Sequence, residues 1–253
     1  MVSISKYVTQ ELDKSVAQDL TEVARTLAEA RHVPNDPLQS VSVLTTKIER
    51  ELSQCMLLAK TRIRTGFGFC VDAVKEMART DSTIDLEALK ENVEVAFSRF
   101  ESVAMAKDMC TQVMQGTSWK SLLGLDETSM QLLYKGAKKL FDSLKYPEAE
   151  AAFFFLTTID YAQYAFWLGL GHAAFQLDNI NQAINAYEMA DSCQPGSIWP
   201  HIYMANCFEI LHDFEEALVS LQNAELELIS NVDKDENLLY EIQNRITHLK
   251  NKK

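Results

Sequence analysis

Apolar residues near the start of the chain recur at steps of three and four, which is the spacing of one face of an α-helix. The first such series consists of Val8, Leu12, Val16, Leu20, Val23 and Leu27. It predicts a helix that ends near His32, because residues 33–37 (Val-Pro-Asn-Asp-Pro) contain two prolines and two turn-forming residues.

Two further series of apolar positions follow in the first half of the chain. The second runs from Leu38 to Ile63, and Gly66 and Gly68 are expected to break or bend this helix. Residues 81–84 (Asp-Ser-Thr-Ile) supply capping residues for a third helix that should reach about Met114. Three long helices with one apolar face each predict a helical bundle or hairpin over residues 1–125.

The second half of the chain carries a set of residue types that returns after 34 positions. Residues 164–197 contain Trp167, Leu170, Gly171, Ala183, Tyr187, Ala190 and Pro195. These residue types and spacings are those of the tetratricopeptide repeat, a helix–turn–helix unit of about 34 residues. Matching residues occupy 130–163 and 198–231, with Ala149, Ala183 and Ala217 at one equivalent position. About three such units are needed for a stable core, so the sequence predicts an all-α, three-repeat solenoid over residues 126–253.

Turn-forming residues divide the second half of the chain into helices. The junction with the first half is predicted at residues 116–124, and the turns inside the repeats at 142–146, 178–181 and 212–215. Pro147 and Pro200 are expected in the first turns of their helices, where a missing N–H is tolerated. Residues 235–250 predict a capping helix that covers the apolar face of the last repeat.

Composition supports a helical protein without disulfides. The 253 residues include only eight glycines and five prolines. No stretch reaches the roughly 20 apolar residues that span a bilayer, and the first residues lack the features of a signal peptide. The five cysteines are scattered and odd in number, which indicates free thiols in a reducing cytosol.

Charge is distributed unevenly along the chain. Residues 1–125 carry a net charge of −2 and residues 126–253 a net charge of −10, and no Lys or Arg lies between Lys145 and Lys234. Such a surface repels phosphate groups, which argues against nucleic acid and anionic membrane as partners of the repeats. It favours a basic or apolar polypeptide, although acidity that only aids solubility accounts equally well for this composition.

The repeats and their surroundings resemble the class II chaperones of bacterial type III secretion, cytosolic proteins that hold hydrophobic translocator subunits before export. The resemblance covers about residues 126–235 and is carried by the Leu-Gly-Leu-Gly block that ends at Gly171, by the Lys145-Tyr146-x-Glu148-Ala149 segment and by Glu215-Glu-Ala-Leu218. It implies a non-catalytic bacterial cytoplasmic protein, associated with virulence, whose first helices line a concave groove for an extended, proline-containing client segment. Most members have only a short N-terminal extension, and the client and the oligomeric state, a homodimer among the alternatives, stay open.

Helix geometry indicates which residues face inward in such a groove, namely the second, fifth, ninth and twelfth of each repeat. These positions hold Gln131, Tyr134, Lys138 and Phe141, then Ala165, Leu168, His172 and Phe175, then Trp199, Ile202, Asn206 and Glu209. The peptide-binding residues predicted from this set are Tyr134, Lys138, Phe141, Leu168, His172, Phe175, Ile202 and Asn206. Exposed apolar positions of this kind mark interaction sites, whereas Trp167, Leu170, Tyr187, Phe153 and Leu221 are assigned to the core.

No catalytic or metal-binding constellation is recognisable in the sequence. The five histidines lie singly, without His-x-x-x-His or Cys-x-x-Cys spacing, and His201 and Cys207 are six residues apart, on different faces of a helix. The segment Gly66-Phe-Gly-Phe69 lacks the Gly-Lys-Ser/Thr ending of a phosphate-binding loop. No cofactor, metal or enzymatic activity is therefore predicted.

Three functional hypotheses follow from these observations. The first is a cytosolic chaperone that binds an extended segment of a type III secretion translocator or effector and keeps it soluble. The second is a structural or regulatory scaffold that holds one fixed protein partner. The third, an enzyme with its chemistry in residues 1–125, lacks any supporting constellation.

Overall fold

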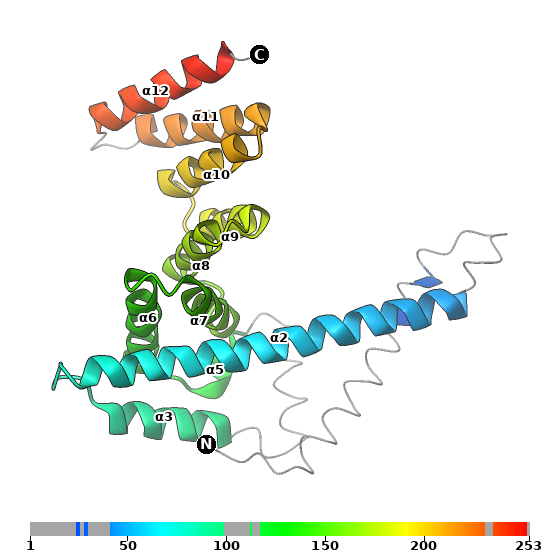
Figure 1. The fold of residues 1–253 in the computed structure, drawn as a ribbon, viewed down its shortest axis with the longest axis vertical. Helices are drawn as coiled ribbons and strands as arrows, with labels where there is room; N and C mark the ends of the chain where they lie inside the picture. Colours follow the sequence, from blue (N-terminus) through cyan, green and yellow to red (C-terminus); the bar gives the residue numbers. More distant parts are fainter. Residues whose placement is uncertain are drawn as a thin grey trace. The chain divides into compact units, whose positions relative to one another are not determined.

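The computed structural model describes residues 24–25, 28–29, 41–98, 112, 117–230 and 235–251 (Figure 1). These residues form helices and turns, without a strand among them, which confirms the predicted all-α class. The first predicted helix lies almost entirely outside the described residues, as does the part of the third beyond residue 98. The chain forms two compact units: residues 1–65 with 81–131, and residues 66–80 with 132–253.

The helices, in chain order, have the following bounds. In the first half they are α2 (Val41–Ala78), α3 (Leu86–Ser98) and α5 (Trp119–Leu123). The second half contains α6 (Glu127–Asp142), α7 (Tyr146–Ile159), α8 (Tyr164–Gln176), α9 (Ile180–Cys193), α10 (Ile198–Ile210), α11 (Phe214–Ser230) and α12 (Glu236–Lys250).

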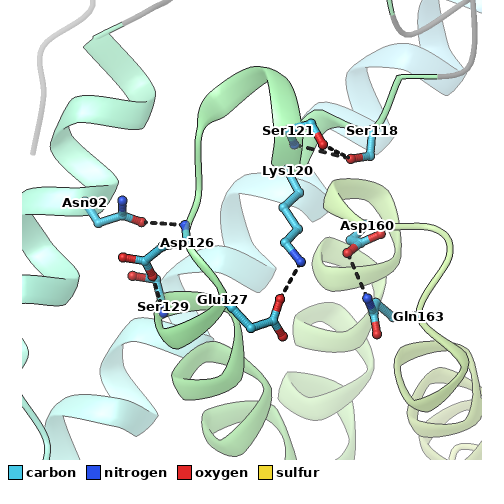
Figure 2. A network of polar contacts seen from close by, with 9 residues as sticks. All are labelled: Asn92, Ser118, Lys120, Ser121, Asp126, Glu127, Ser129, Asp160 and Gln163. Atoms are coloured by element: carbon cyan, nitrogen blue, oxygen red, sulfur yellow. Dashed lines mark hydrogen bonds and ion pairs between the residues drawn. The ribbon is translucent and has the colours of Figure 1, made fainter.

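Local capping fixes the helix ends in the first unit. Asp85, directly after the predicted capping segment, accepts a hydrogen bond from the Ala88 backbone N–H at 2.9 Å. The Ser118 hydroxyl caps α5, and Lys120 Nζ lies 2.6 Å from Glu127 Oε2 (Figure 2). Asp126 caps α6 by accepting from the Ser129 N–H at 2.6 Å. Each of these bonds satisfies a helix-terminal N–H or links two neighbouring elements of this unit.

Helix α2 continues through the two glycines, so the prediction that they break it is wrong. Gly66 lies so close to the Ala151 carbonyl that an added Cβ would overlap it. One turn further, Cys70 Sγ donates to the Ala152 carbonyl at 3.9 Å, and a Cβ on Gly136 would lie 2.7 Å from the Cys70 carbonyl oxygen. The missing side chains therefore allow close packing of α2 on α6 and α7.

This packing places residues 66–80 in the compact unit of the repeats, whereas the sequence pattern predicted them in the N-terminal region. The Phe67 and Phe155 rings add an aromatic contact, with centroids 5.3 Å apart. The domain boundary between residues 125 and 126 stays a prediction.

The helices of the second half form pairs whose turns recur every 34 residues. Leu144, Asp178 and His212 occupy the turns after α6, α8 and α10, all with left-handed φ angles of 58° to 61°. The predicted turn positions are thus confirmed, and Pro147 and Pro200 lie in first turns as expected. From α7 to α12 each helix packs on the next in the chain (Figure 1). The total number of repeats stays a prediction.

Small residues permit this close stacking. Ala149, Ala183 and Ala217 are fully buried, and a Cβ on Gly171 would overlap the Tyr187 ring. Between α7 and α8 the chain is held by Gln163, whose amide donates to Asp160 Oδ2 at 3.1 Å (Figure 2). The predicted core residues Leu170, Tyr187, Phe153 and Leu221 are buried, whereas Trp167 is partly exposed and donates its indole N–H to the Tyr161 carbonyl.

Helix α12 closes the C-terminal end of the stack as predicted. Asp235 caps it by accepting hydrogen bonds from the N–H groups of Asn237 and Leu238. Ile242, Ile246 and Leu249 then pack in one apolar cluster with residues of α11, including Leu221 and Leu228. Among the described helices, none is long and apolar enough to span a membrane.

Candidate peptide-binding surface

A row of rings runs across the first helices of the three pairs. Phe141 on α6 contacts His172 on α8, with ring centroids 6.3 Å apart. His172 in turn meets Tyr203 on α10 edge to face at 4.6 Å, and Tyr203 stacks on Trp199 at 6.1 Å. Phe141, His172 and Tyr203 are 31 residues apart, which is one repeat less about one helical turn, so they meet on neighbouring helices. We use the name first-helix face for the following residues: Tyr134, Phe141, Leu168, His172, Phe175, Trp199 and Tyr203.

The remaining members of this face are anchored in the core on one side. Tyr134 is half-buried and packs against the rings of Phe166 and Phe153, at centroid distances of 5.5 and 6.2 Å. Leu168 and Phe175 are also half-buried and pack on the apolar cluster of α8, α9 and α10. Packing fixes their positions while leaving part of each side chain accessible, which is the property that a preorganised binding surface requires.

Lys138 lies between Tyr134 and Phe141 along α6 and is exposed. Its ammonium group pairs with Asp142 one turn further along α6, at 2.8 Å. The hydrogen bond to Asp142 and the carboxylate's charge raise the pKa of Lys138. The pair is electrically neutral, so Lys138 adds little net positive charge here.

The third helix pair consists of α10 and α11. Its inward positions differ from the prediction because α12 covers part of α10. Ile202 is only 8% exposed and packs in the cluster with α11 and α12, so the expectation that it faces solvent is wrong. Arg245 on α12 donates to Asn206 Oδ1 at 2.7 Å and to Glu209 Oε1 at 2.5 Å. We therefore leave Ile202 and Asn206 out of the surface proposed below.

Two accessible residues of the third pair complete the row instead. Trp199 is 46% exposed and occupies one of the predicted inward positions. Tyr203, at the sixth position of its repeat, was missed because the periodic rule selects positions two, five, nine and twelve. Its contact with His172 brings it onto the face.

His172 is enclosed by rings on three sides, including that of Tyr187 at 5.7 Å. Burial disfavours the charged imidazolium and lowers the pKa of His172 below its ordinary value of 6.5. As the pH falls, His172 therefore binds a proton at a higher pH in the unfolded chain than in the folded chain. The stability of the fold consequently decreases as the pH drops below about 6.5.

The difference in the pKa of His172 between the folded and the unfolded chain leads to a measurable pH dependence of stability. The melting temperature of the wild-type chain should fall between pH 7 and pH 5 more steeply than that of His172→Gln, which cannot take up the proton. The difference between the two curves isolates His172 from the other four histidines. Parallel curves would show that His172 is not desolvated in the folded chain.

In the part of the chain that the structure describes, the other titratable groups do not assemble into a site. Among the described residues, no three His, Cys, Asp or Glu side chains lie close enough to hold a metal ion. His201 Nε2 lies 3.4 Å from Asp191 Oδ1, and its buried Nδ1 atom has no hydrogen-bond partner within the described ranges. Cys70, Cys193 and Cys207 form no disulfide with one another, and burial raises the pKa of the Cys207 thiol to about 11.

Comparisons with known proteins give matches at the level of structure. No family model and no curated protein matches this sequence. A chain from a type III secretion complex of Aeromonas hydrophila aligns with a TM-score of 0.54 and 20% identity, over 58% of this chain and 97% of that one.

Two further solved structures align less closely. The type III secretion translocator chaperone SycD of Yersinia enterocolitica aligns with a TM-score of 0.48 and 22% identity, over 53% of this chain and 98% of its own. PcrH of Pseudomonas aeruginosa, solved with the chaperone-binding region of PopD, aligns with a TM-score of 0.48 and 20% identity. The alignment covers 51% of this chain and 96% of PcrH. At such identities the Aeromonas match establishes the fold, and the predicted resemblance is confirmed at that level.

Proposed function

We propose that this protein is a non-enzymatic, cytoplasmic chaperone of bacterial type III secretion. It binds an extended segment of a translocator or effector protein on the first-helix face and keeps that client soluble before export. The observation that carries the proposal is the continuous row of half-accessible rings from Phe141 to Trp199 across three helices. Partly exposed apolar side chains held in fixed positions are typical of peptide-binding surfaces.

The chemistry of the surface suits an extended apolar segment. Its rings and aliphatic side chains can accept alternate side chains of a client strand, while Lys138 contacts polar groups beside them. The proposed contact residues are Tyr134, Lys138, Phe141, Leu168, His172, Phe175, Trp199 and Tyr203. The motif resemblance around Gly171 and the fold shared with the Aeromonas chain support type III secretion as the setting.

Co-expression tests this proposal. The full chain should be expressed with each secreted protein encoded beside its gene, and the soluble fraction scored for co-purification. A soluble stoichiometric complex with a membrane-active export is the expected result. Failure with every export, together with stable recovery of one non-secreted partner, would contradict the chaperone function and favour a scaffold.

A further inference from the structure

Helix α11 is apolar on two opposite faces. Its inner face, formed by Ala217, Leu221, Ala224 and Leu228, is buried against neighbouring helices. Val219, Leu226 and Ile229, at spacings of seven and three, form a stripe on the other side. Their exposed fractions are 48%, 66% and 50%, respectively. A helix that is apolar on both faces normally buries both, so this stripe indicates a partner.

Acidic side chains border the stripe. Glu215 and Glu216 are exposed at the start of α11, and Glu227 lies on the flank beside Leu226. No Lys or Arg occurs between Lys145 and Lys234, so helices α7 to α11 carry no Lys or Arg side chain themselves. The outer face of α11 is therefore an apolar stripe in a negatively charged surrounding.

We propose that the outer face of α11 is a docking site for a basic amphipathic helix of a partner protein. The apolar side of such a helix would cover Val219, Leu226 and Ile229, while its Lys or Arg side chains meet the bordering glutamates. A second copy of this chain would instead bring like charges together, and an anionic membrane would be repelled. The site lies on a second helix of a pair and does not depend on the first-helix face.

A pair of synthetic peptides tests the proposal on the full-length protein. The first is an amphipathic Leu/Lys helix of about 18 residues, and the second replaces every Lys by Glu. Fluorescence anisotropy should show binding of the Leu/Lys peptide alone. The double variant Leu226→Gln/Ile229→Gln, which leaves the charge unchanged, should weaken that binding at least about tenfold, since it removes the apolar contacts.

Matched variants distinguish this stripe from the remaining apolar surface of the chain. Tyr240→Gln, which removes another exposed apolar side chain, and Trp199→Ala, on the first-helix face, should leave the affinity unchanged. Equal binding to the wild type and the double variant would overturn the proposal, because the attraction would then be charge alone. Dimers or phosphatidylglycerol-vesicle binding that the double variant abolishes would also overturn it, in favour of a second copy or a membrane. Circular dichroism verifies that the double variant is folded, and Val219→Gln provides an independent replacement.

Discussion

Replacing Gly66 by alanine should lower the free energy of unfolding by about 1–2 kcal/mol, although alanine favours helices more than glycine does. The added Cβ would overlap the Ala151 carbonyl and approach the Phe155 Cβ to 2.9 Å. Because the closest atoms belong to the backbone of α7, no side-chain rotation can relieve the overlap. Helix α2 must move away from α7, and the packing around Cys70 is weakened with it.

Gly68 in the same helix provides the matched control. A Cβ at this position meets no atom of any described residue within 4 Å. Gly68→Ala should therefore raise the free energy of unfolding by about 0.5–1 kcal/mol through helix propensity alone. Urea denaturation of both variants measures the difference. Equal stabilisation by the two substitutions would show that α2 does not pack closely on α7.

Trp199→Ala should weaken the affinity for a client segment about 30-fold or more. Trp199 is the most accessible ring of the row and stacks on Tyr203, and tryptophan is enriched among the interface residues that contribute about 2 kcal/mol or more. Calorimetric titration of the purified chain with the client segment found by co-expression measures this loss.

Two further variants make the result specific. Trp199→Phe retains a stacking ring and should restore most of the affinity. Tyr240→Ala removes a side chain that is 67% exposed on α12, outside the first-helix face, and should have no effect. A client affinity that Trp199→Ala leaves unchanged would remove this residue from the proposed site.

The paired helices were predictable because individual residue types recur along the sequence at the repeat period of 34 residues. Small residues such as Ala149 and Ala183 must recur where helices touch, so their spacing gives the turns at Leu144 and Asp178 directly. Residues 236–250 were predictable as a helix for a related reason, since the end of a solenoid needs an apolar helix to cover it.

The role of Gly66 could not be read from the sequence. Glycine inside an apolar helical pattern indicates either a break or a close approach, and the atom that decides between them belongs to Ala151, 85 residues away. Ile202 was misplaced for a similar reason. Its position within the repeat predicts exposure, but it packs in the apolar cluster that residues of α11 and α12 complete, and a rule based on repeat positions does not take that cluster into account.

Tyr203 shows the opposite error, because a rule about inward positions omitted a residue that belongs to the row. The signal that could have found it is the 31-residue spacing from Phe141 to His172 to Tyr203, three ring-bearing residues in series.

Photo-crosslinking of the purified client complex shows directly whether the client binds on the first-helix face. A photoreactive phenylalanine analogue would replace either Trp199, on the first-helix face, or Tyr240, on the exposed side of α12. We expect position 199 to crosslink to one segment of the client and position 240 not to crosslink. Crosslinking from position 240 without any from position 199 would show that the client binds elsewhere on the molecule.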